Sequence, residues 1–116
     1  MNVNDGPSLS WTPINANSGA GADNTIVAGV AGKSILVWKI MLVLGATASA
    51  ITVKDGAATA LTGPLSLVAN GSMTLPFDAA PWFKTSPGNA FILNSGAAVQ
   101  LSGLVGYTFS PANIQP

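Results

Sequence analysis

Residues 35–44 read Ile-Leu-Val-Trp-Lys-Ile-Met-Leu-Val-Leu, the longest apolar stretch of the 116-residue chain. The stretch is rich in β-branched and aliphatic residues, and it is about half as long as the roughly 20 residues of a membrane-spanning helix. It therefore predicts a strand, placed at 34–45. A strand with one solvated face alternates apolar and polar residues. This one carries a single charged residue, Lys39, so both of its faces are expected to be covered.

Strict alternation divides this strand into two faces. One face would hold Leu36, Trp38, Ile40, Leu42 and Leu44. The other would hold the residues predicted to form a subunit interface: Ile35, Val37, Lys39, Met41 and Val43. A two-layer sandwich covers only one face of each sheet. The second cover is then a loop or terminal arm of the same chain, or another subunit.

The rest of the chain repeats short aliphatic or β-branched runs separated by Gly, Asn, Asp and Pro. Its 13 Gly and 8 Pro leave no window for a long helix. Seven or eight strands at this spacing predict an all-β fold, either a β-sandwich or a barrel. The favoured fold is an antiparallel β-sandwich that is jelly-roll-like. Besides 34–45, strands are expected at 24–30, 48–54, 58–67, 72–77, 90–94 and 98–109, with short extended pieces near 8–14 and 82–85.

The two ends of the chain differ from its middle in composition. Residues 1–22 are rich in Asn, Ser, Gly and Pro and are predicted to form an extended N-terminal arm. Residues 23–110 are predicted to form the β-sandwich domain, and residues 111–116 a short C-terminal tail. The apolar residues of the arm are candidate contacts with a partner protein: Val3, Leu9, Trp11 and Ile14.

The chain contains no His, Cys, Glu or Arg. Most enzymes use His, Cys or Glu for proton transfer or nucleophilic attack, and zinc and transition-metal sites draw on His and Cys. The four Lys are scattered and matched by four Asp, so binding to nucleic acid through phosphate contacts is not expected. The composition predicts a non-enzymatic protein, without metal or cofactor, that works by presenting a surface.

Charged residues make up only 7% of the chain, with a net charge of zero, against about 25% in an average soluble protein. So few charges cover little of a folded surface, and zero net charge promotes association. The chain is therefore predicted to pack against copies of itself or against a partner.

Three motifs could carry chemistry, and each is interpreted as structural. The segment 32–34, Gly-Lys-Ser, resembles the end of a phosphate-binding loop, but Val27 stands where that loop needs its first glycine. Asp55 and Asp78 could form a catalytic pair, yet both stand in turn sequences, where Asp bonds to nearby backbone. Lys39 could act as a base for a serine; the alternative is a lysine at a sheet edge or a subunit interface.

The aromatic pair Trp82 and Phe83 follows Pro81 in an expected loop. The favoured interpretation is that the pair caps the open end of the sandwich, because aromatic side chains follow burial. The alternative is a platform that binds a ligand such as a glycan.

Four segments resemble a group of small proteins from tailed phages and prophages: Thr25–Lys33, Ala60–Leu65, Leu75–Phe77 and Pro81–Thr85. The resemblance extends over residues 24–108. Some similar small β-sandwich proteins are capsid decoration, or cement, proteins that sit as trimers on the icosahedral shell. The resemblance offers no active site to match onto this chain.

The resemblance implies a virion protein that is made in the host cytoplasm and located on the capsid surface. Its expected partners are copies of itself, as a trimer, and the major capsid protein, with the N-terminal arm contacting the capsid. Neither a nucleic acid nor a membrane is an expected partner. The alternative is a receptor- or glycan-binding module of a phage tail or baseplate that uses Trp82 and Phe83.

Overall fold

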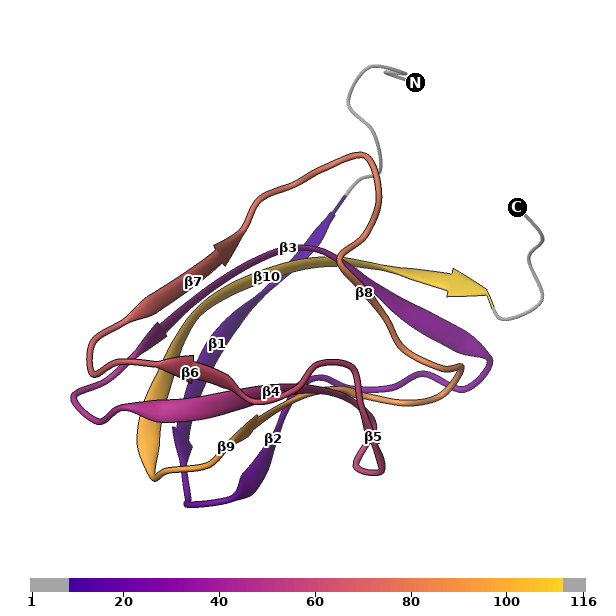
Figure 1. Ribbon diagram of the computed structural model, residues 1–116. Helices are drawn as coiled ribbons and strands as arrows, with labels where there is room; N and C mark the ends of the chain where they lie inside the picture. Colours follow the sequence, from indigo (N-terminus) through magenta and orange to yellow (C-terminus); the bar gives the residue numbers. More distant parts are fainter. Residues whose placement is uncertain (1–8, 112–116) are drawn as a thin grey trace.

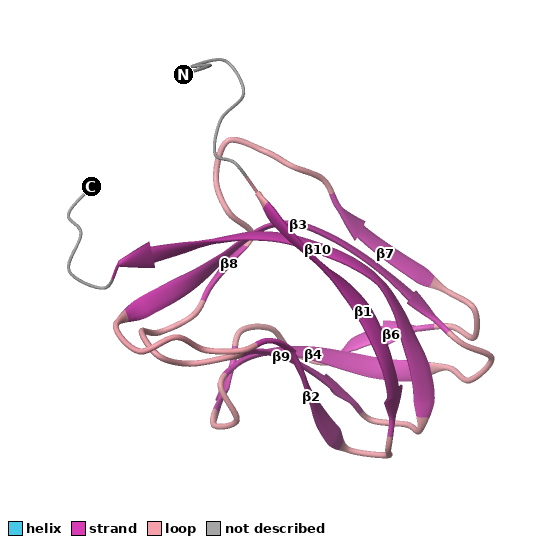
Figure 2. Ribbon diagram, turned by 180° about the vertical axis from the view of Figure 1, so that it is seen from behind, coloured by secondary structure: helices cyan, strands magenta, loops and turns pink. Residues whose placement is uncertain are grey.

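The fold is a sandwich of two antiparallel sheets, seen edge-on in Figure 1. The computed structural model describes residues 9–111, which contain strands and no helix (Figure 2). The strands within this range are β1 (Ser10–Ser18), β2 (Ala22–Val27), β3 (Lys33–Leu44), β4 (Ser49–Asp55), β5 (Thr59–Ala60), β6 (Leu65–Leu67), β7 (Ser72–Leu75), β8 (Phe83–Lys84), β9 (Phe91–Ser95) and β10 (Val99–Pro111).

Strands from the two ends of the described chain pair with each other, and this pairing continues inwards along the sequence. Sheet A has the order β1-β10-β3-β7, with β8 also pairing with β3, and sheet B has the order β2-β9-β4-β5, with β6 also pairing with β4. The first strand thus pairs with the last and the second with the ninth, which is the wrapped double-sheet pattern of a jelly roll. Because β5 and β6 share one position, as do β7 and β8, each sheet has four strand positions. The predicted jelly-roll-like sandwich is confirmed.

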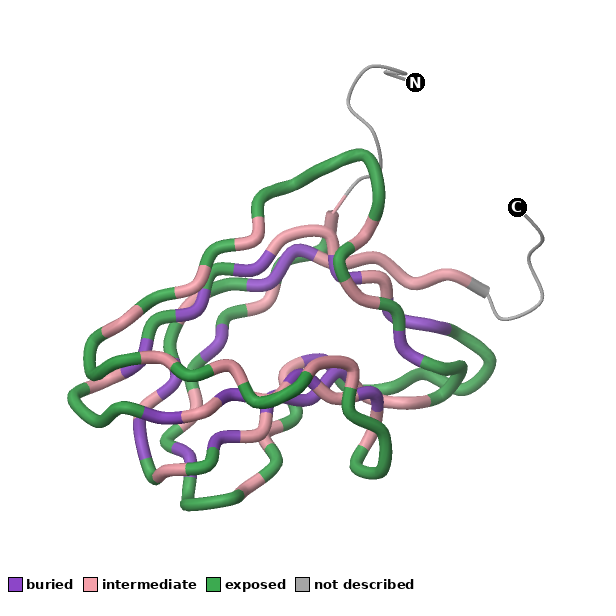
Figure 3. Tube along the Cα trace, viewed as in Figure 1, coloured by how far each residue is buried: buried purple, intermediate pink, exposed green. Residues whose placement is uncertain are grey.

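The core lies between the two sheets, where the buried segments of the chain face one another in Figure 3. Each fully buried aliphatic or aromatic side chain contributes about 1.5–3 kcal/mol to stability. Within residues 9–111 no buried side-chain nitrogen or oxygen atom lacks a hydrogen-bond partner. The central core residues are Ile14, Val27, Ile35, Val37, Ile40, Leu42, Leu44, Ile51, Val53, Phe91, Leu93, Val99, Leu101 and Val105.

A β-bulge in β3 changes which of its residues face the core. Val37 pairs with Tyr107 and Lys39 pairs with Gly106, so Trp38 between them has no partner on β10. One extra residue shifts the alternation of the strand by one position. The buried apolar residues of β3 are therefore Ile35 and Val37 before the bulge, and Ile40, Leu42 and Leu44 after it.

The prediction that Ile35, Val37, Lys39, Met41 and Val43 share one face is wrong, because it assumed unbroken alternation. Ile35 and Val37 have no exposed surface and belong to the core of the same chain. Lys39 is half-buried, and Met41 and Val43 are 40% and 36% exposed, all on the outer face of sheet A. Only these last three remain available to a partner.

The prediction of an extended N-terminal arm is also wrong for residues 9–22, the part of the arm that the structure describes. Residues 10–18 form β1 and pair with β10 along their whole length, and β2 begins at Ala22 in sheet B. β1 can hold many polar residues because it is an edge strand and only every second residue faces the core. Ile14 is one of these inward-facing residues and is 2% exposed. Val3 lies outside the described residues, as do residues 112–116 of the predicted tail. Pro111 is the last residue of β10.

Gly103 in β10 leaves no room for a side chain. Its φ is 146°, and a Cβ atom there would lie 1.8 Å from the carbonyl oxygen of Met41. We expect Gly103→Ala to lower the free energy of unfolding by more than about 3 kcal/mol in urea denaturation. The control is Gly63→Ala, because no heavy atom lies within 4 Å of the Cβ position at Gly63. Equal stability of the two variants would contradict this packing.

Candidate functional site

The exposed large apolar side chains gather on one side of the molecule. Within residues 9–111 they are Trp11, Val30, Met41, Val43, Val68, Phe77, Trp82 and Leu104. All but Val30 and Val68 lie on the outer face of sheet A or on the loop that joins β7 to β8. A folded sandwich gains nothing from such a concentration on the outside of one sheet, so this side is the candidate functional site.

Strand pairing assembles a single patch on the outer face of sheet A from distant parts of the sequence. Gly106 of β10 pairs with Trp11 on one side and Lys39 on the other. Two residues away, Leu104 pairs with Met41. We call this surface the outer patch, and its members are Trp11, Lys39, Met41, Val43 and Leu104.

Trp11 is held in place by a glycine on the neighbouring strand. A Cβ atom at Gly106 would lie 2.9 Å from the Trp11 ring, so the indole rests directly on the backbone of β10. The Lys39 ammonium lies 6.0 Å from the centre of this ring, at the outer limit of a cation–π contact. Together with Met41 and Leu104, these two residues line a hollow of about 250 Å³.

The second feature of this side is the 76–82 loop, which joins β7 to β8 and rises from the outer side of sheet A (Figures 1 and 2). The bulged residue Trp38 anchors the loop. Its ring stacks on Phe77 at 5.6 Å, and its Nε1 donates a hydrogen bond of 2.9 Å to the hydroxyl of Thr108. At the end of the loop, the Trp82 Nε1 donates a hydrogen bond of 2.7 Å to the carbonyl oxygen of Pro76.

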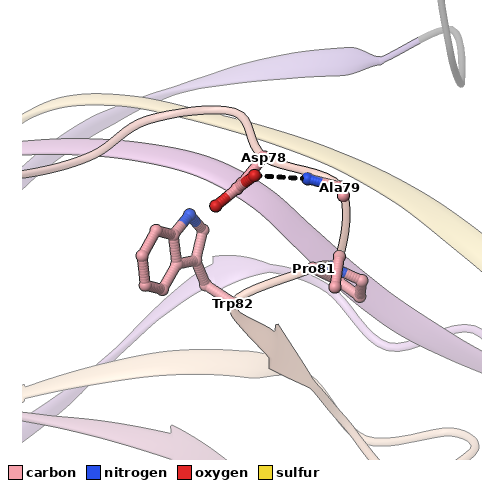
Figure 4. A pocket seen from close by; sticks show the side chains of 5 residues that line it. Asp78, Ala79, Pro81 and Trp82 are labelled. Carbon is pink, nitrogen blue, oxygen red and sulfur yellow. Dashed lines mark hydrogen bonds between the residues drawn. The ribbon is translucent and has the colours of Figure 1, made fainter.

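The 76–82 loop presents a carboxylate beside an exposed indole (Figure 4). Asp78 and Trp82 line a hollow of about 290 Å³ together with residues 79–81. One carboxylate oxygen of Asp78 accepts a hydrogen bond of 2.7 Å from the backbone N–H of Ala79. Within residues 9–111 the only ion pair joins Lys54 to Asp23, so Asp78 has no cationic partner there.

Trp82 and Phe83 do not form a joint platform for a ligand, the alternative that the sequence left open. Successive residues of an extended chain point to opposite sides. Phe83 therefore packs against the core, with its ring 6.0 Å from that of Phe91, whereas Trp82 stays 42% exposed. A ligand would meet one aromatic ring here and not two.

The other apolar residues assigned to the arm are divided between surface and interior. Trp11 belongs to the outer patch and Ile14 to the core. Leu9 is half-buried beside Gly106. Leu104 is not among the residues predicted from the sequence to contact a partner, although it is the one large apolar residue among the outward-facing residues of the strand expected at 98–109. This interruption of the apolar–polar alternation is the sequence signal that could have identified Leu104.

Asp55 has a structural role. It is 6% exposed and accepts hydrogen bonds from the backbone N–H of Ser86 at 2.9 Å, the Ser86 hydroxyl at 2.8 Å and the Asn89 side-chain amide at 3.1 Å. Burial raises the pKa of Asp55, but these three hydrogen bonds lower it by more, so the pKa lies below its ordinary value. The carboxylate therefore ties the end of β4 to the segment before β9.

The remaining candidate motifs carry no site within the described residues. In the segment 32–34, Gly32 lies in a turn closed by a hydrogen bond from the Lys33 N–H to the Val30 carbonyl oxygen, and Lys33 and Ser34 are the first residues of β3. Residues 9–111 contain no group of three or more His, Cys, Asp or Glu side chains that could hold a metal ion. Hydrogen bonds from Asn94 and Lys54 hold the pKa of Asp23 below its ordinary value, on the exposed side of sheet B.

The chain matches no model of a known protein family, no curated protein and no solved structure. The part of the chain that the structure describes also holds no helix capable of spanning a bilayer. The outer patch and the 76–82 loop are therefore the features that bear on the function of the protein.

The lowered pKa of Asp55 makes stability depend on pH. Because the folded pKa lies below the ordinary value of 3.8, the contribution of Asp55 is complete above that value and is lost as the pH falls through the folded pKa. We expect Asp55→Asn to lower the free energy of unfolding by about 1–3 kcal/mol at pH 7. The free energy of unfolding of this variant should also fall less than that of the wild type as the pH is lowered towards pH 2.

Urea denaturation of the wild type and Asp55→Asn at a series of pH values measures this effect. Ser86→Ala removes the hydroxyl that donates to Asp55. The loss in free energy of unfolding that it causes should therefore be smaller in a protein that already carries Asp55→Asn. Independent, additive costs of the two substitutions would show that the hydrogen bond from the Ser86 hydroxyl to Asp55 does not stabilise the fold.

Proposed function

We propose that the protein is a non-enzymatic structural protein that works as a homo-oligomer, with the outer patch as its association surface. The outer patch itself carries this proposal. Its residues lie outside the core, which is complete without them, since the inner faces of the two sheets already cover each other. Large apolar groups that do not serve the fold mark an interaction surface.

The composition of the outer patch suits a protein partner. Trp and Met are enriched at protein interfaces, and polar residues are typical of their rims. Around the outer patch, Asn15 and Ser102 pair with each other on one side and Val43 pairs with Ser72 on the other. A nucleic acid or an anionic membrane would require a group of basic residues, whereas the outer patch has only Lys39.

The association is expected to use the face of sheet A and not its edge. β1 forms one edge of this sheet and carries Pro13 in its middle. Proline has no N–H to donate to an added strand, and natural sheets use it to protect their edges from pairing. The exposed apolar surface lies instead on the face beside Pro13, which pairs with Leu104.

The biological role that we propose is capsid decoration on a tailed phage or prophage head, with the major capsid protein as the second partner and three copies in the oligomer. This role comes from the resemblance of the sequence segments, and the neutral, charge-poor surface supports it. A protein that binds only the assembled shell stabilises the shell by mass action. Many symmetric copies multiply a modest contact.

The alternative role is a receptor- or glycan-binding module of a phage tail or baseplate. One observation favours it: Trp82 is exposed beside the Asp78 carboxylate at a hollow. Binding of the purified protein to empty capsid shells, compared with binding to host cells, separates the two roles.

The association surface is tested by polar substitutions in the outer patch. We expect Met41→Ser and Leu104→Ser each to weaken self-association and co-sedimentation with empty shells of the encoding phage by at least about tenfold, the cost of a moderate interface contact. Both residues are about 40% exposed (40% and 42%), so stability should change little.

The matched control is Val68→Ser, which removes a 72% exposed apolar side chain outside the outer patch. It should associate and sediment like the wild type. If all three variants behave alike, or if the wild type neither associates with itself nor binds shells, the proposed function is wrong.

A further inference from the structure

The outer side of sheet A carries a ridge beside a hollow. The ridge is the 76–82 loop, which rises from the sheet in both ribbon views (Figures 1 and 2). The hollow is the one in the outer patch, lined by Trp11, Lys39, Met41 and Leu104. β3 connects the two features: its Ile40 pairs with Leu75, the last residue before the loop, and the neighbouring Lys39 faces the hollow. Ridge and hollow thus lie side by side on one surface.

The ridge and the hollow have opposite charges. Lys39 is the one charged residue that lines the hollow, and Asp78 is the one charged residue of the 76–82 loop. They do not pair with each other within the chain, because the single ion pair among residues 9–111 is Lys54–Asp23. Each feature therefore presents a charge that a second molecule could neutralise.

The position of Lys39 limits what can cover the outer patch. A purely apolar partner would enclose the ammonium group without a counter-charge, and burial of an unpaired charge is costly. The covering surface must therefore combine apolar groups with a carboxylate. Among the described residues Asp23 is already paired with Lys54, and Asp55 is buried among its three donors.

Asp78 is the remaining described carboxylate, and its surroundings match the requirement. It lies on a projecting loop with Phe77, Ala79, Ala80 and Pro81, which are apolar and mostly exposed. Small residues at positions 79 and 80 allow the loop to approach another surface closely. The loop thus has both the apolar character and the charge that the hollow requires.

We infer that the partner covering the outer patch is a second copy of this chain, whose 76–82 loop sits in the hollow with its Asp78 paired to Lys39. This inference rests on the proposed function, because it names the surface that makes the oligomer. The contact joins two different surfaces, so it forms a reciprocal pair, a closed ring or an open chain of copies. A ring of three is the arrangement that agrees with the trimer implied by the resemblance.

Charge reversal tests the contact. We expect Lys39→Asp and Asp78→Lys each to weaken self-association at least tenfold in sedimentation equilibrium, because each variant brings two like charges together. The double variant K39D/D78K restores the opposite charges and should associate within about threefold of the wild type. The control is Lys33→Asp, which makes the same change in net charge as Lys39→Asp at the exposed first residue of β3 and should associate normally.

A mixture of the two single variants distinguishes a reciprocal pair from a ring of three. In a reciprocal pair made of one Lys39→Asp chain and one Asp78→Lys chain, both contacts join opposite charges, so association is restored. In a ring of three at least one contact joins like charges, so association stays weak. Either result supports the contact, provided that the double variant associates.

The inference and the proposed function can fail separately. If Lys39→Asp and Asp78→Lys associate like the wild type while Leu104→Ser does not, the outer patch is an association surface but the 76–82 loop does not fill it, and the inference is wrong. A wild type that binds shells as a monomer overturns the inference together with the homo-oligomer of the proposed function, and leaves only the binding to the shell. Circular dichroism of each variant shows that the fold is retained.

Discussion

The β-bulge at Trp38 determines which side chains of β3 lie inside the sandwich and which lie outside. If alternation continued unbroken from Ile35 and Val37, the next inward residue would be Lys39, and its ammonium group would enter a core formed by apolar side chains. An unpaired charge in such a core costs several kcal/mol. The extra residue turns Lys39 outwards and brings Ile40 and Leu42 inwards, so the core and the outer patch both depend on it.

The same irregularity connects the fold to the surface that we propose to be functional. Trp38 has no partner on β10, yet its ring stacks on Phe77 and its Nε1 donates to Thr108, so the bulged residue supports the 76–82 loop. On β10, the residue opposite the far side of the bulge is Gly106, whose bare backbone receives the Trp11 ring. The ridge and one wall of the hollow are therefore placed by the same local break in strand pairing.

Sequence reasoning predicted the fold class because turn residues and short β-branched runs are local signals. It failed where the outcome depends on pairing with a distant strand. The segment 10–18 looks like a loose arm, but β10 recruits it as an edge strand that buries little more than Ile14. The bulge in β3 and the grouping of Trp11 with Leu104 follow from the register of β10 against two neighbours, and no local pattern reveals this register.

The few charges of the chain are distributed unequally between the two sheets, and this asymmetry supports sheet A as the contact side. On sheet B, Asp23 and Lys54 form an ion pair that Asn94 extends, and Asp55 is held by Ser86 and Asn89. These groups are satisfied within the chain. On sheet A and its 76–82 loop, the charged residues Lys33, Lys39, Lys84 and Asp78 have no ionic partner among the described residues. Of these, Lys39 and Asp78 line the two hollows. If copies associate through sheet A, the polar outer face of sheet B is left to water. A neutral, charge-poor protein would then keep its hydrated surface after its apolar one is covered.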